Sequence, residues 1–110
     1  MKTREKTNIE KILKELKAAL HRLYGGRFMK LILYGSYARN EARKGSDIDV
    51  AVLLDGKVLP GQEIDRMLDI ITDINLKYNV LISAYPVSQE SLETIKSPLL
   101  LNIPREGVSV

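Results

Sequence analysis

The chain has 110 residues and a formal net charge of +3, and it contains one histidine and no cysteine. This length predicts a single domain, residues 1–110, that can bury a core without covalent staples. The absence of cysteine excludes disulfides, thiolate metal sites and cysteine nucleophiles, and it favours a cytoplasmic protein. No apolar run approaches the ~20 residues of a membrane span, so we expect no membrane partner.

The charge is distributed unevenly along the chain. Residues 1–30 contain nine Lys or Arg and three Glu, whereas residues 31–110 contain eight Lys or Arg and eleven Asp or Glu. A basic N-terminal segment attracts anions such as nucleic acid or a nucleotide. A solvated helix face explains the same pattern more simply, and no recognised RNA-binding motif is present. RNA binding is therefore the least favoured of the hypotheses for this chain.

The first predicted element is a helix over residues 8–23. Asn8 is a good N-cap, and Gly25-Gly26 terminates the helix. The apolar residues recur at helical spacing and form one stripe. They are Ile9, Ile12, Leu13, Leu16, Ala19, Leu20 and Leu23. His21 lies off the stripe, so we expect it to be exposed, and a lone histidine excludes a multi-histidine metal site.

Strands and helices alternate in the rest of the chain. Apolar runs predict strands over 28–34, 48–54 and 79–87, and Pro86 predicts that the last one ends or lies at a sheet edge. Helices are predicted over 36–41, 62–77 and 89–96, with a helical turn at 98–102 and an extended or frayed tail at 105–110. The apolar face of the helix over 62–77 consists of Ile64, Met67, Leu68, Ile71 and Ile74. Two amphipathic helices on one side of a small sheet make a two-layer α/β or α+β domain.

The segment between Gly35 and Asp49 carries the chemistry. Gly35 and Ser36 end the first strand where a helix is predicted to begin, and glycine and free amides at such a turn favour close approach of a phosphate. Asp47 and Asp49 are two residues apart on a strand and therefore point to one face. Paired carboxylates of this kind suit Mg²⁺ completed by substrate phosphates. Each feature alone is common on protein surfaces, but together they describe a nucleoside-triphosphate site.

This spacing resembles a known family. Gly-Ser, ten residues and then Asp-x-Asp is similar to the signature of the polymerase-beta nucleotidyltransferase superfamily, and the whole segment resembles the minimal nucleotidyltransferases of prokaryotes. The resemblance implies the nucleotidyltransferase fold, a small mixed β-sheet with helices packed on one face. It also implies that Gly35 and Ser36 bind the triphosphate, and that Asp47 and Asp49 are catalytic and hold two Mg²⁺ ions.

The reaction and the partner are likewise implied by the resemblance. The family transfers a nucleoside monophosphate, often AMP from ATP, to a hydroxyl and releases pyrophosphate. Many minimal members are antitoxins encoded beside a HEPN-domain toxin, and some adenylylate a tyrosine of that toxin. The expected partners are therefore ATP or another nucleoside triphosphate and a HEPN-type protein, with a homo-oligomer left open. Arg39 and Lys44 are candidates for neutralising triphosphate charge, with surface solvation as the alternative.

The chain departs from the family at one metal-binding position. Active superfamily members usually carry a third carboxylate on the strand after the second helix. The polar-facing positions of the strand over 79–87 are Asn79, Leu81, Ser83 and Tyr85, and none is acidic. We place the equivalent position at Ser83, whose hydroxyl is a poor Mg²⁺ ligand and no base near neutral pH.

Two hypotheses follow from this departure. In the first, the chain is an enzyme that adenylylates a partner toxin. In the second, it is a catalytically weak or inactive binding module that neutralises the toxin by occlusion. The chain has no room for a helical acceptor-binding domain, so we expect the acceptor to be presented in trans.

Overall fold

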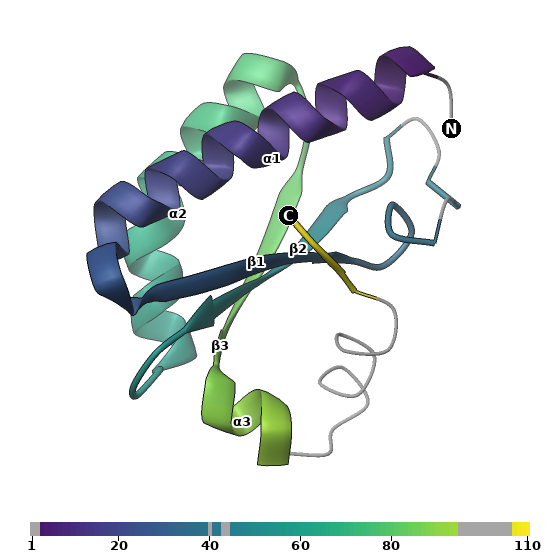
Figure 1. Ribbon diagram of the computed structural model, residues 1–110. Helices are drawn as coiled ribbons and strands as arrows, with labels where there is room; N and C mark the ends of the chain where they lie inside the picture. The colour runs from purple at the N-terminus through teal and green to yellow at the C-terminus, as the bar shows by residue number, and fades with distance from the viewer. Residues whose placement is uncertain (1–2, 40, 43–44, 95–106) are drawn as a thin grey trace.

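The computed structural model describes residues 3–39, 41–42, 45–94 and 107–110. Its elements are α1 (Thr3–Tyr24), η1 (Gly25–Arg27), β1 (Phe28–Tyr34), β2 (Ile48–Leu54), α2 (Pro60–Tyr78), β3 (Ile82–Ser88), α3 (Gln89–Thr94) and β4 (Val108–Ser109). The sheet has the strand order β3-β2-β1-β4, in which β2 and β3 are parallel and the other neighbours are antiparallel. α1 and α2 cover one face of this sheet (Figure 1). The predicted small mixed sheet with helices on one face is therefore confirmed, while the turn predicted at 98–102 lies outside the described residues.

α1 packs through the predicted stripe, with one exception at its C-terminal end. Six of the seven stripe residues are buried, namely Ile9, Ile12, Leu13, Leu16, Ala19 and Leu20. Leu23 is 40% exposed, so its prediction as a core residue is wrong, and Tyr24 is buried in its place. The helix ends where Gly25 adopts φ +56°, and the chain then turns through η1 into β1. His21 is exposed as predicted. Its ring packs edge-to-face on the ring of Phe28, with the two ring centroids 4.6 Å apart.

α2 packs on the sheet with only part of the apolar face predicted for it. Ile64 and Leu68 are 42% and 55% exposed, so two of the five residues assigned to its apolar face are not in the core. The other three are on the core side as predicted, since Met67 and Ile74 are buried and Ile71 packs against the main core. Glu63 is buried on the same side at 4% exposure. A buried carboxylate is stable only when it is paired, which no hydrophobic pattern can indicate.

The partners of Glu63 come from the junction between α1 and β1. The hydroxyl of Tyr24 donates to Glu63 Oε1 at 3.1 Å, and the guanidinium of Arg27 lies 3.5 Å from Oε2. Arg66 contributes a second ion pair at 3.6 Å from within α2. Arg27 also donates to the carbonyl of Lys57, at 2.8 Å. This polar cluster therefore joins the end of α1 to the start of α2 and to the loop before it.

The central strand β2 is buried on both sides. Its side chains facing α1 and α2 belong to the main core, namely Ile48, Val50, Val52 and Leu54. On the opposite face Ala51 and Leu53 form a second cluster with Ile32 and Val87. The partly buried side chains packed on this second cluster are Tyr34, Tyr85 and, from α3, Leu92. The catalytic carboxylates predicted from the sequence therefore lie at one end of a strand that is held from both faces.

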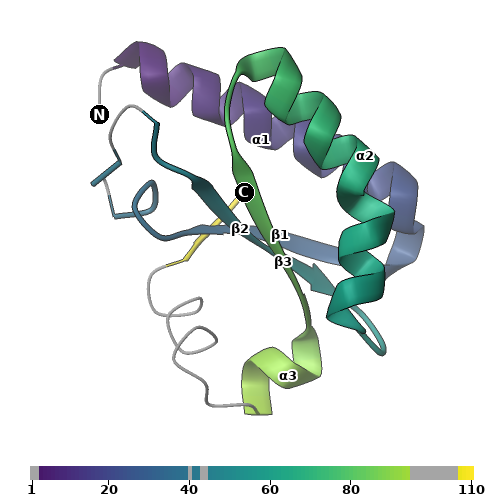
Figure 2. The same ribbon diagram turned by 180° about the vertical axis from the view of Figure 1, so that it is seen from behind.

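β3 forms one edge of the sheet, as the proline in it predicts (Figure 2). It starts three residues later than expected because α2 continues to Tyr78 and Asn79 caps it at φ 54°. Ser88 caps the helix that follows β3, since its Oγ accepts a hydrogen bond from the Ser91 amide at 3.0 Å. At the other edge, residues 108–109 form the short extended piece β4 beside β1. Over the described residues, no helix is both long and apolar enough to cross a membrane.

Candidate functional site

The turn after β1 is built around Gly35. Its φ of +74° is a left-handed conformation that other residues adopt at a cost. The Gly35 carbonyl accepts from the Arg39 amide at 3.1 Å, and the Ser36 carbonyl accepts from the Glu41 amide at 2.8 Å. The segment therefore makes one hydrogen-bonded helical turn, and the short helix predicted over 36–41 is wrong because the described residues there are turn and coil.

Gly35 lies directly against the carboxylate of Asp49. A Cβ on Gly35 would overlap Asp49 Oδ2 and lie 3.2 Å from its Cγ. The register explains the contact, because Tyr34 pairs with Asp49 across β1 and β2 and Gly35 follows at once. The glycine is therefore required both by its backbone conformation and by the carboxylate beside it. The structure thus brings together the glycine turn and the acidic pair that the sequence places ten residues apart.

Asp49 is half-buried, whereas Asp47 is exposed. Burial raises the pKa of Asp49 above its ordinary value, and the negative charge of Asp47 raises it further. The positive charge of Arg39 acts in the opposite direction on that pKa, which shows that its guanidinium lies within electrostatic reach of Asp49. Two like charges held close on one strand end form a site that a cation would stabilise.

Asp49 has a neighbour on each adjacent strand. In register, Tyr34 of β1 lies on one side of it and Ser83 of β3 on the other. The predicted position Ser83 is thus directly beside Asp49, and its side chain is exposed. Tyr34 was not among the candidates, although its place just before Gly35 was a usable signal. Burial raises the pKa of the Tyr34 hydroxyl, with smaller contributions from Asp49 and Tyr85.

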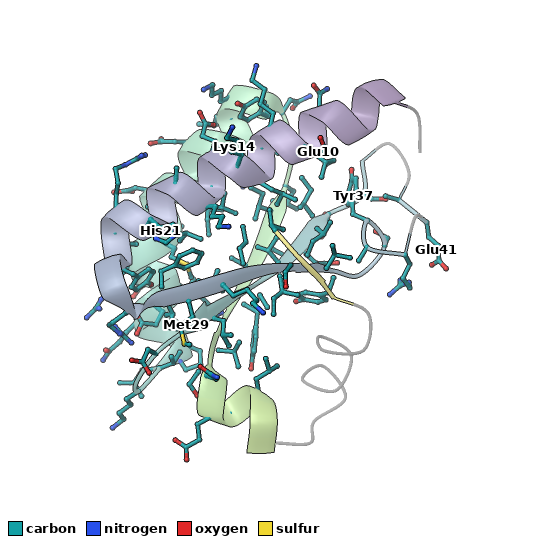
Figure 3. The ribbon with its side chains drawn as sticks, viewed as in Figure 1. Glu10, Lys14, His21, Met29, Tyr37 and Glu41 are labelled. Atoms are coloured by element: carbon teal, nitrogen blue, oxygen red, sulfur yellow. The ribbon has the colours of Figure 1, made fainter. Side chains whose placement is uncertain are left out.

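The remaining candidates lie in the loop between β1 and β2. Arg39 is held by an ion pair with Glu41, at 3.0 Å between Nε and Oε2. Tyr37 is partly buried against the main core, and Figure 3 places it next to the N-terminal half of α1, with Glu41 at the outer end of the loop. Lys44 lies outside the described residues.

The donor set at this site fits a magnesium ion only in part. Two carboxylates are present, and the described part of the chain holds no group of three or more His, Cys, Asp or Glu side chains that could bind a metal. Asp69 and Asp73 are exposed on α2, as expected for solvated carboxylates. The oxygens of Asp47 and Asp49 suit Mg²⁺ when substrate phosphates supply further ligands.

A mixed sheet with two helices on one face and a glycine turn against a strand-borne acidic pair is the arrangement of a nucleotidyltransferase. Residues 9–98 match the family described as the nucleotidyltransferase domain. The chain belongs to this family, and it is a nucleotidyltransferase.

Curated relatives are named as protein adenylyltransferases. A protein of Methanocaldococcus jannaschii named "Putative protein adenylyltransferase MJ0604" is 41% identical over 83 residues, covering 76% of this chain and 77% of that protein. MJ0141 of the same organism has the same descriptive name and is 33% identical over 103 residues, covering 93% of this chain and 98% of that protein. The similarity to MJ0141 therefore extends over nearly the whole length of both chains.

Two solved structures share the fold. One is a toxin-antitoxin with AMP-PNP, with a TM-score of 0.61 and 18% identity over 86% of this chain and 68% of that chain. The other is a mutant of the toxin-antitoxin MntA-HpeT, with a TM-score of 0.58 and 18% identity over 91% of this chain and 69% of that chain. At this level of identity, the likeness concerns the fold alone.

Proposed function

We propose that the chain transfers AMP from ATP, with Mg²⁺, to a hydroxyl group on a partner protein. The observation that carries the proposal is the contact of Gly35 with Asp49, beside Asp47 and Arg39. In this arrangement the Gly35–Ser36 turn faces the phosphates, and the two aspartates supply the protein ligands of two Mg²⁺ ions. The metal ions supply charge neutralisation of the triphosphate.

The chain's own residues then have separate roles. Arg39 and Lys44 neutralise triphosphate charge, and Ser36 donates to a phosphate oxygen. The acceptor oxygen forms a bond to the α-phosphorus, the bond from that phosphorus to the β-phosphate breaks, and pyrophosphate leaves. The hydroxyl proton passes to solvent water.

We further propose that this activity belongs to a cytoplasmic antitoxin and that the modified partner is a HEPN-type toxin. The names of the solved neighbours, which are toxin-antitoxin proteins, support this pairing. The names of the curated relatives, which refer to protein adenylylation, support a protein acceptor.

A second candidate function rests on Ser83. Ser83 pairs with Asp49 in register, which supports the prediction that its hydroxyl takes the position of the third carboxylate. With a neutral group there, the same fold would bind the toxin and occlude it without transferring a nucleotide.

Calorimetric titration of MgATP tests the nucleotide site. The wild type is compared with Asp47→Asn/Asp49→Asn, and Asp69→Asn/Asp73→Asn serves as the matched control because it removes two exposed carboxylates from α2. We expect magnesium-dependent binding that only the first variant loses. Absence of binding by the wild type at millimolar nucleotide would contradict the proposal and favour occlusion.

A further inference from the structure

A strip of β3 lies beside the catalytic carboxylates and is open to solvent. Parallel pairing sets Ser83 opposite Asp49 and Tyr85 opposite Ala51. One residue before β3, the carbonyl of Leu81 accepts from the Ile48 amide at 2.9 Å, so Leu81 continues the same register beside Asp47. Because side chains alternate along a strand and Ile82 faces the main core, Leu81, Ser83 and Tyr85 share the face of Asp49.

The three side chains of this strip differ in how far they are exposed to solvent. Leu81 is 55% exposed, although it adjoins the most polar part of the molecule. Ser83 is exposed and Tyr85 is half-buried. Among the described residues β3 is an edge strand, and no other strand of that part of the chain pairs with this side. An apolar side chain at the rim of an acidic site gains free energy when a partner covers it, at ~25 cal/mol for each Å² removed from water.

The backbone of the same edge is poorly suited to strand addition. The carbonyl of Leu81 accepts a hydrogen bond from β2, and the direction of the backbone groups alternates along a strand. The backbone groups that point away from the sheet are therefore those of residues 82, 84, 86 and 88. The Ile82 amide already donates to Asn75 Oδ1 at 3.0 Å, and Pro86 has no amide hydrogen. An approaching chain would therefore meet side chains at this edge and few free backbone donors.

We infer that Leu81, Ser83 and Tyr85 form the acceptor-recognition strip, and that the acceptor is a hydroxyl side chain of a protein segment flanked by apolar residues. This inference rests on the proposed function. The apolar flank packs on Leu81 and Tyr85, and the acceptor hydroxyl then lies over Ser83 next to Asp49. There its oxygen bonds to the α-phosphorus, its proton passes to solvent water and pyrophosphate leaves. Leu81 is thus a specificity residue for the acceptor and does not bind the nucleotide.

The test uses two synthetic peptides that carry one tyrosine, flanked by leucines in the first and by serines in the second. Transfer from α-labelled ATP is measured for the wild type, Leu81→Ala and Leu68→Ala. Leu68 on α2 is the matched control because its exposure is also 55%. We expect the wild type and Leu68→Ala to prefer the leucine-flanked peptide at least tenfold in kcat/KM. Leu81→Ala should lose that preference through a higher KM for the peptide, with unchanged MgATP affinity.

Several results would overturn the inference. These are equal use of both peptides by the wild type, the same behaviour of Leu81→Ala and Leu68→Ala, or weaker MgATP binding by Leu81→Ala, which would make the strip part of the nucleotide site. MgATP binding without transfer to either peptide contradicts the acceptor assignment and leaves the nucleotide site in place. Absence of both MgATP binding and transfer contradicts the proposed function itself.

Discussion

At the scale of single residues, Gly35 is required for two reasons: its left-handed backbone conformation and its close contact with Asp49. Gly35→Ala combines a left-handed φ with an overlap on Asp49. Gly56→Ala is the matched control, since Gly56 has φ +83° and a Cβ added there would meet nothing within 4 Å. We expect Gly56→Ala to cost about 1 kcal/mol in the free energy of unfolding and Gly35→Ala about 2 kcal/mol or more, with loss of MgATP binding only in the latter. Urea denaturation and calorimetry would measure both. Equal effects of the two variants would contradict the role of the Asp49 contact.

Ser83 decides between the two candidate functions at the same scale. Ser83→Asp adds a third carboxylate in register with Asp49. Because added ligand charge strengthens Mg²⁺ binding, we expect tighter magnesium-dependent ATP binding and transfer at least tenfold faster. Ser83→Asn controls for size without adding charge. An aspartate variant that is no better than the asparagine variant would place the third-ligand position elsewhere.

At the scale of secondary structure elements, the contact of Tyr24 with Glu63 joins α1 to α2. Burial, followed by the charge of Glu63, raises the pKa of Tyr24 to about 12 from the ordinary 10. The phenol is protonated in both folded and unfolded chains below pH 10. Between pH 10 and 12 only the unfolded chain loses this proton, so the free energy of unfolding falls as the pH rises.

Tyr24→Phe tests this linkage. At neutral pH we expect a loss of about 1 kcal/mol for the missing hydrogen bond. Above pH 10, the variant should lose stability less steeply than the wild type, because it lacks the shifted group. Urea midpoints at pH 8 and pH 11 provide the measurement. Parallel pH dependence of the two proteins would show that the Tyr24 proton does not contribute.

At the scale of the whole molecule, β2 couples the two cores. Leu54 belongs to the core under α1 and α2, and Leu53 belongs to the cluster on the opposite face. We expect Leu53→Ala and Leu54→Ala each to destabilise by about 2–5 kcal/mol and to keep a single transition. Far-UV circular dichroism and tyrosine fluorescence should give the same urea midpoint in each variant. Separate midpoints for the two probes would mean that the faces unfold independently.

At the same scale, packing on both faces holds the end of the sheet that carries the proposed site. Asp49 lies on a strand that is fixed from both faces, and the segment after Gly35 is anchored through Tyr37 on the main core. A site on a rigid element keeps its groups in place without a bound ligand. The proposed acceptor strip, by contrast, lies on β3, which is an edge strand among the described residues.

Local patterns in the sequence were sufficient for most of the elements, although the short helix predicted over 36–41 is wrong. The strands over 28–34 and 48–54 were predicted with the bounds that the structure has. A short apolar run bounded by glycine and polar turns is typical of a buried strand. The roles of Gly35, Ser36, Asp47 and Asp49 stay predictions from the sequence, although the structure brings Gly35 and Asp49 together.

Other features depended on contacts between segments far apart in the chain. The sequence could not predict that Glu63 is buried or that Ile64 and Leu68 are exposed, because the rotation of α2 depends on Tyr24 and Arg27, more than thirty residues earlier. Strand order and register likewise determined that Tyr34 and Ser83 flank Asp49 and that Leu81 adjoins Asp47. The sequence by itself determined which groups are available, since residue type and local spacing carry that information. Only the tertiary structure decided which of them meet, because strand pairing and helix packing are set by the burial of the whole chain.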